Sequence, residues 1–198
     1  MNANRETSRR GSQVPTGRGT SAVGVSVRTA LLAGLIAILI NTALLHMADF
    51  IPLKVQGAGL FKGLKLVFGG FVVQTPLPAL WTQLHLPAPE SAEFKFWFHA
   101  VVGLVMAVVY AALLEPRSPD PAWVTGLLYA LLAWLLNAFV LLPAIGEGVA
   151  GVRQSTPAGI AYYAMAHTVF FVLMAVLYAR LRLRPRSAGQ LTPSAGLS

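Results

Sequence analysis

The chain has 198 residues, of which 56% are hydrophobic, only 11% are charged and none is cysteine. A soluble globular domain carries about 25% charged residues, so this composition excludes an ordinary soluble domain and predicts a membrane protein. The lack of cysteine excludes disulfides, thiolate metal sites and cysteine nucleophiles. The formal net charge of +8 does not indicate nucleic acid as a partner, because the arginines lack interleaved aromatic residues.

Basic residues gather at the two ends of the chain. Residues 1–26 are predicted to be a disordered basic tail, and residues 184–198 a second disordered tail. The basic residues after the last apolar segment are Arg180, Arg182, Arg184 and Arg186. Such clusters mark the cytoplasmic side of spans, so we expect both termini in the cytoplasm, with the lipid bilayer as a partner.

Four stretches are long and uncharged enough to cross a hydrocarbon core of about 30 Å. They cover residues 28–48, 96–114, 122–142 and 159–179. The backbone inside hydrocarbon must satisfy its own hydrogen bonds, so each stretch is predicted to be helical. We therefore expect an all-α integral membrane four-helix bundle over residues 27–183.

The predicted membrane domain contains two pairs of similar segments. Residues 99–111 match residues 167–179 at an offset of 68, and residues 29–41 match residues 125–137 at an offset of 96. The repeated unit is a hairpin of two spans. The sequence thus predicts two tandem helical-hairpin repeats, 28–114 and 122–181.

The first hairpin carries an insertion, residues 49–94, on the side opposite the termini. Apolar residues recur there at helical spacing, at Leu60, Leu64, Phe68 and Phe71, and Lys62 and Lys65 lie on another face. This pattern predicts an amphipathic helix in the membrane interface, ended by Gly69-Gly70 and the following prolines. A re-entrant segment or a fifth crossing over residues 66–88 stays open as an alternative.

Four polar side chains fall inside the predicted spans, at Asn41, His99, Asn137 and His167. At 1.5 Å of rise per residue they share one depth, and the repeat relates them by a pseudo-two-fold axis along the membrane normal. One hypothesis is packing, with each asparagine bonded to the histidine of its own hairpin. In another, His99 and His167 ligate haem iron or a transition metal; in a third, the layer passes a substrate or proton.

Other residues receive structural interpretations. Tyr110 and Tyr178 are predicted to anchor the cytoplasmic interface, and His46 and His85 to be solvated on the outer side. Close helix packing is expected at Gly103, Ala107 and Ala111, which recur every four positions. In the second outer loop, Glu147 and Arg153 are expected to form a flexible ion pair.

A resemblance to a known family rests on residues 131–181. They contain an apolar span ending in Leu141-Leu-Pro143, a glycine-containing outer turn, and a His-led span closing with Val-Leu-Tyr178. Together with the equivalent 99–110 helix, this is similar to the YagU-like small four-helix inner-membrane proteins. The resemblance implies a polytopic inner-membrane protein and carries over no catalytic residue.

No paired carboxylates lie within the predicted spans, and the sequence contains no H-E-x-x-H, no Gly-x-Ser-x-Gly and no glycine-rich phosphate loop, so we predict no enzyme. Three hypotheses remain. The first is an accessory or structural membrane protein that binds lipid or a membrane-protein partner. The second is a haem- or metal-binding module that uses His99 and His167. The third is a small transporter or channel subunit, which with four spans needs a homo-oligomer to enclose a path.

Overall fold

The computed structural model describes residues 21–51, 53–54, 59–115, 118 and 120–182, with side chains from Val27 onward. This described part is helical and contains no β-strand. The first helix begins at Ser21, so it already includes the last residues of the predicted N-terminal tail. The rest of that tail and the whole predicted C-terminal tail, with Arg184 and Arg186, lie outside the described residues.

The helical elements follow one another in chain order. They are α1 (Ser21–Met47), η1 (Ala48–Phe50), α2 (Gly59–Val73), α3 (Leu77–Gln83), α4 (Ala92–Val109), η2 (Tyr110–Leu114), α5 (Ala122–Leu136), η4 (Asn137–Leu141), α6 (Leu142–Ala144), η5 (Val149–Gly151) and α7 (Pro157–Arg182). Four helical segments are long and apolar enough to cross a membrane: Val27–Phe50, Ala92–Leu114, Ala122–Ala144 and Pro157–Arg182. They coincide with the predicted spans within a few residues.

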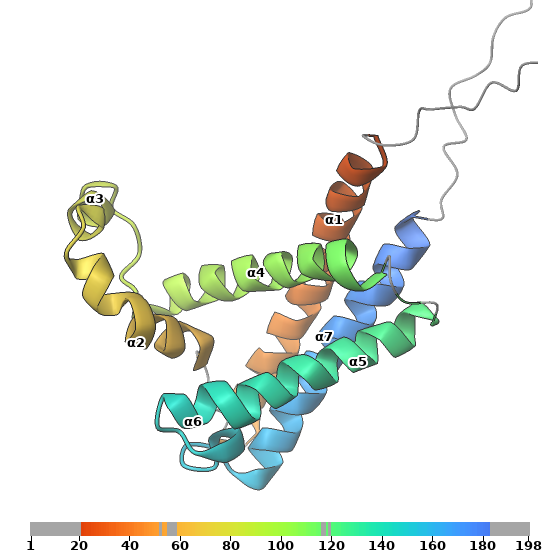
Figure 1. Cartoon of the computed structure of the whole chain (residues 1–198). Coiled ribbons are helices and arrows are strands. Elements are labelled where there is room, and N and C mark those ends of the chain that lie inside the picture. Colours follow the sequence, from red (N-terminus) through yellow and green to blue (C-terminus); the bar gives the residue numbers. More distant parts are fainter. Residues whose placement is uncertain (1–20, 52, 55–58, 116–117, 119, 183–198) are drawn as a thin grey trace, which may run out of the picture.

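The four long helices pack through small residues. α1 lies along α7, α4 crosses α1, and α5 crosses α7 (Figure 1). A methyl group built on Gly34 of α1 would come within 2.6 Å of the Ala107 side chain, and one on Gly126 of α5 within 2.9 Å of Ala175. Ala107 and Ala175 are equivalent in the two related segments. The prediction that Gly103, Ala107 and Ala111 mark close packing is confirmed, because all three are buried.

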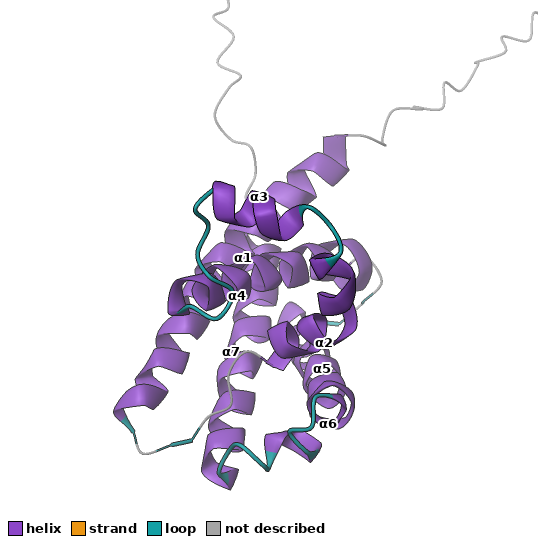
Figure 2. Cartoon of the chain, turned by 90° about the vertical axis from the view of Figure 1, so that its left-hand side faces the viewer, coloured by secondary structure: helices purple, strands orange, loops and turns teal. Residues whose placement is uncertain are grey.

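The insertion packs between the outer parts of α4 and α5. The ring of Phe61 in α2 lies 5.0 Å from that of Phe94 and 5.4 Å from that of Phe98, both in α4. On the other side, α2 touches η4, where Gly63 lies directly against Leu141. Figure 2 shows α2 and α3 in front of the long helices. α4 and α5 therefore do not pack along their lengths as α1 and α7 do.

The buried face of α2 differs from its predicted apolar face. Leu64, Phe68 and Phe71 are exposed, and Gly59 and Gly63 are buried instead. In a membrane protein, apolar side chains are stable facing lipid, so their helical spacing does not tell which face packs. The helix continues through Gly69-Gly70, so the glycines do not end it, but it stops at Val73, just before the first of the predicted prolines, Pro76. A bend of 96° separates α2 from α3.

The largest buried side chains gather at the end of the bundle that holds the α4–α5 link. Tyr110 and Tyr178 are each 1% exposed, and their rings meet edge to face with centroids 6.0 Å apart. The prediction that they anchor the interface is therefore wrong, because both belong to the core. At the same end, Arg182 of α7 pairs with Glu115 after α4. This ion pair places the α4–α5 link beside the C-terminal end of α7.

Candidate functional site

Asn41 ties three helices together in the middle of the structure. Its side chain is fully buried within α1. The amide nitrogen donates a hydrogen bond of 2.8 Å to the carbonyl oxygen of Ala166 in α7, and the amide oxygen lies 3.0 Å from Nε2 of His99 in α4. A buried amide in an apolar interior is stable only when its donor and acceptor are both satisfied. Both ends of Asn41 are satisfied here.

The partners fix the orientation of the amide and the tautomer of His99. A backbone carbonyl can only accept, so the NH₂ group of Asn41 must face Ala166. The amide oxygen then faces His99, and Nε2 of the neutral imidazole must carry the proton that it donates to Asn41. The other ring nitrogen of His99, Nδ1, consequently holds a lone pair.

His167 of α7 lies beside His99, with ring centroids 6.2 Å apart and ring planes at 76°. Its Nδ1 donates a hydrogen bond of 2.9 Å to the carbonyl oxygen of Tyr163, one helical turn earlier. The ring of Tyr163 also lies against it, with a centroid distance of 4.0 Å. Because Nδ1 carries the proton, Nε2 of His167 holds a lone pair.

The fourth predicted residue, Asn137, is not part of this cluster. Among the described residues its side chain forms no hydrogen bond with either histidine. It lines a cavity of about 20 Å³ together with Tyr163 and Ser155, which is room for one water molecule. Asn41, His99 and His167 are therefore brought together, and Asn137 occupies a different environment.

Two local features separate Asn137 from its counterpart. Asn137 begins the π-helical turn η4, whereas Asn41 lies in an uninterrupted α-helix. Pro143 follows shortly, and a proline lacks the N–H of the regular ladder and crowds the carbonyl four residues earlier, here that of Phe139. By the repeat, the carbonyl equivalent to Ala166 is that of Phe98, whose ring packs on α2 rather than on α5.

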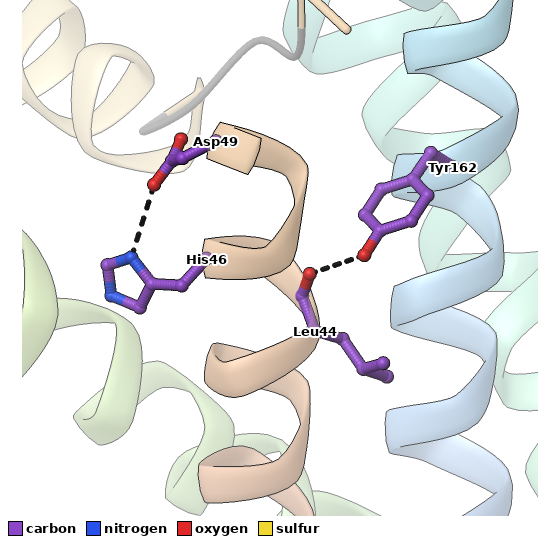
Figure 3. Close-up of polar contacts among 4 residues, drawn as sticks. All are labelled: Leu44, His46, Asp49 and Tyr162. Carbon is purple, nitrogen blue, oxygen red and sulfur yellow. Dashed lines mark hydrogen bonds and ion pairs between the residues drawn. The ribbon is translucent and has the colours of Figure 1, made fainter. Parts of the chain in front are cut away.

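The remaining histidines lie apart from the cluster. Figure 3 shows His46 at the end of α1, where Nδ1 lies 3.4 Å from the carboxylate of Asp49 on the exposed surface. His85 is exposed, with a left-handed backbone φ of 51°. Tyr162 of α7 donates a hydrogen bond of 2.5 Å to the carbonyl oxygen of Leu44, on the other side of α1 (Figure 3). The last carbonyls of a helix lack partners within it, so Tyr162 ties down this end of α1.

The loop between α6 and α7 contains a partly buried ion pair. The Glu147 side chain is 7% exposed, and its Oε1 accepts a hydrogen bond of 2.7 Å from Nζ of Lys62 in α2. Arg153 donates to the carbonyl oxygen of Gly146 instead. The predicted pairing of Glu147 with Arg153 is therefore wrong, because the insertion supplies the cation. Oε2 of Glu147 is buried and has no partner among the described residues.

An exposed ion pair on the same helix offers a contrast. Lys65 donates a hydrogen bond of 2.8 Å to Glu90, and both side chains are more than 60% exposed. This hydrogen bond and the charge of Lys65 lower the pKa of the Glu90 carboxyl below its ordinary value. Two neighbouring lysines of α2 thus form ion pairs, Lys62 with the buried carboxylate of Glu147 and Lys65 with the exposed carboxylate of Glu90.

The residues around the histidines do not fit a haem. A porphyrin needs small side chains beside its ligands, and Gly103 lies one helical turn after His99. In the structure, a methyl group on Gly103 would come within 2.6 Å of Cδ1 of Ile38, so this face is filled by α1. Its repeat counterpart Phe171 is buried in the core.

Some residues of the site had little signal in the sequence. Tyr163 precedes His167 by four residues, the spacing at which side chains share a helix face, and this spacing would have indicated the ring contact. The carbonyl of Ala166 carries no side-chain signal at all. Lys62 stood out as a charge on an apolar helix, but its partner lies 85 residues away.

Compared with known proteins, the chain matches no family model, no curated sequence and no solved structure. The resemblance to the YagU-like family therefore stays a proposal.

Proposed function

We propose that this is a non-enzymatic accessory or structural protein of the bacterial inner membrane, with four spans, both termini in the cytoplasm and membrane lipid or a partner helix as its ligand. The observation that carries the proposal is how the long helices distribute their side chains. On α1, small residues such as Ala33 and Ala37 are buried, whereas Leu32, Leu35 and Leu39 are 44–52% exposed. A helix with its large aliphatic side chains outward suits hydrocarbon or another apolar helix.

The interior polar groups support the same role. The amide nitrogen and the amide oxygen of Asn41 both form hydrogen bonds with other residues of the chain. On the cytoplasmic side of the cluster the interior is apolar, because Ile38, Phe170 and Met174 are each at most 3% exposed. A single chain packed in this way favours a structural role over transport, and a transporter or channel subunit would need its path between copies.

Topology is the first test, and the absence of native cysteine makes the experiment simple. Single cysteines at Ser118, in the α4–α5 link, and at Ser155, before α7, are labelled in intact and in opened cells by a membrane-impermeant maleimide. We expect Ser118→Cys to react only in opened cells and Ser155→Cys to react in both. Labelling of the two positions from the same side would contradict the four-span proposal.

Assembly is the second test. Chemical crosslinking in native membranes, followed by mass spectrometry, is expected to yield partner proteins or lipid and no obligate ring of identical copies. A stable homo-oligomer with a crosslinked central seam would instead support the transporter or channel hypothesis.

A further inference from the structure

Each histidine of the central cluster keeps one ring nitrogen free of hydrogen bonds within the described residues. These atoms are Nδ1 of His99 and Nε2 of His167, because the other nitrogens donate to Asn41 and Tyr163. In the described part of the chain, the buried side-chain nitrogen and oxygen atoms without a hydrogen-bond partner comprise Glu147 Oε2 alone. The two free histidine nitrogens do not belong to this group, so they remain accessible. Two lone pairs are thus available from neighbouring imidazoles on different helices.

Histidines that bind metals show this arrangement. The ring N–H of a metal-ligating histidine is almost always held by a carbonyl or carboxylate, which orients the ring and leaves the second nitrogen for the ion. Here Asn41 holds His99, and the backbone of Tyr163 holds His167. Both rings are therefore oriented before any ion arrives.

The separation of the rings indicates the coordination geometry. With metal–nitrogen bonds of about 2.0 Å and about 1.1 Å from nitrogen to ring centre, two imidazoles on opposite sides of one ion have centres roughly 6 Å apart. A tetrahedral angle at the ion would bring the centres to about 5 Å by the same reckoning. The observed centroid distance of 6.2 Å between His99 and His167 leaves room for one ion between facing nitrogens, and it is closer to the near-linear value than to the tetrahedral one.

We propose that His99 and His167 bind one copper(I) ion, through Nδ1 of the former and Nε2 of the latter. Among the described residues no group of three or more histidine, aspartate or glutamate side chains converges. Zinc sites almost always supply four protein ligands, or three and a water molecule, so two histidines are too few for zinc. Copper(I) accepts two donors in line, and imidazole is a good ligand for copper. This ligand role goes beyond the proposed structural one and does not depend on it.

The test uses the full-length protein without a histidine tag, purified in mild detergent and titrated anaerobically with copper(I) in competition with bicinchoninate. The chain has four histidines, so the double variant His46→Ala/His85→Ala retains only the cluster and is the matched control. We expect one copper per chain in the wild type and in this control, and affinity weakened by about tenfold or more in His99→Ala and in His167→Ala. X-ray absorption of the loaded control should show two nitrogen neighbours and no sulfur.

Two results would overturn the proposal. One is a wild-type protein that leaves all copper with the competitor, as expected if a water molecule bridges the two rings. The other is binding that disappears in His46→Ala/His85→Ala and persists in the cluster variants, which would assign the metal to the surface pair of His46 and Asp49. If a cluster variant does not fold, the titration of the double variant alone decides, because it retains no other histidine.

Discussion

Asn41 and Asn137 occupy equivalent places in the two related sequence segments but have different surroundings. Asn41 is fully buried and joins α1 to α4 and α7. Asn137 begins a π-helical turn and faces a small cavity. α2 lies beside Phe98, the residue that corresponds to Ala166, and α5 does not pack along α4. Similar sequence segments therefore do not ensure similar sites when one hairpin carries an extra element.

The largest effect is expected at the buried asparagine. Asn41→Leu removes two hydrogen bonds and leaves the N–H of His99 without its partner, so we expect a loss of about 1–3 kcal/mol in the free energy of unfolding. Asn137→Leu is the matched control and should change it by about 0.5 kcal/mol or less. Unfolding in detergent by a chemical denaturant measures both. Equal losses would mean that the two asparagines have equivalent roles.

A pair of glycines in α2 tests whether the insertion packs closely on α5. Gly63 lies directly against Leu141, whereas a methyl group on Gly70 would meet nothing within 4 Å. Alanine is the better helix former at both positions, so overpacking against Leu141 should leave Gly63→Ala about 1–2 kcal/mol less stable than Gly70→Ala. Gly70→Ala should stabilise it by about 0.5–1 kcal/mol, because alanine is the better helix former. Thermal unfolding of the two variants measures the contrast, and equal stabilisation by both would show that α2 is not seated on η4.

The two lysines of α2 sharpen the same comparison. Lys62→Ala leaves the buried carboxylate of Glu147 without its cation, and since Lys62 itself is half exposed we expect a loss of about 1–2 kcal/mol. Lys65→Ala removes an exposed pair with Glu90 and should cost about 0.5 kcal/mol or less. The pair of variants is compared by denaturant unfolding at neutral pH. The reverse ranking would contradict the burial of Glu147.

The smallest effect concerns the protonation of Glu90. Its pKa is lowered in the folded protein, so its pair with Lys65 contributes at neutral pH and is lost as the pH falls through that lowered value. In Lys65→Ala the pKa of Glu90 should rise toward the ordinary value of 4.5. Carbon-detected NMR of labelled glutamate side chains follows this titration. An unchanged Glu90 pKa in the variant would show that the ion pair does not persist in solution.

Much of the fold was predictable because hydrophobic length alone limits where a chain can cross a membrane. The predicted span 122–142 agrees closely with the observed Ala122–Ala144, and the predicted 96–114 with Ala92–Leu114. Small residues at four-residue spacing likewise predicted close packing of α4 on a neighbouring helix, and the structure shows that this helix is α1. The orientation of α2 was not predictable, because lipid and protein accept the same apolar side chains and the pattern does not distinguish them.

The central site was predictable only in part. The matching depth of Asn41 and His99 follows from helix rise and hairpin topology, and their hydrogen bond is found in the structure. The surroundings of Asn137 depend on where the insertion packs and on the turn near Pro143, and neither can be read from the repeat. Tyr110 and Tyr178 show a similar limit, because a tyrosine near a span end suits either the interface or the core.

The most direct test of the difference between the hairpins is a pair of double-mutant cycles in the free energy of unfolding. One cycle combines Asn41→Leu with His99→Leu, and the other combines Asn137→Leu with His167→Leu. The structure predicts a coupling of about 1 kcal/mol in the first cycle, where a hydrogen bond joins the side chains, and a coupling near zero in the second. Equal coupling in both cycles would contradict this difference, because it would mean that Asn137 interacts with His167 as Asn41 interacts with His99.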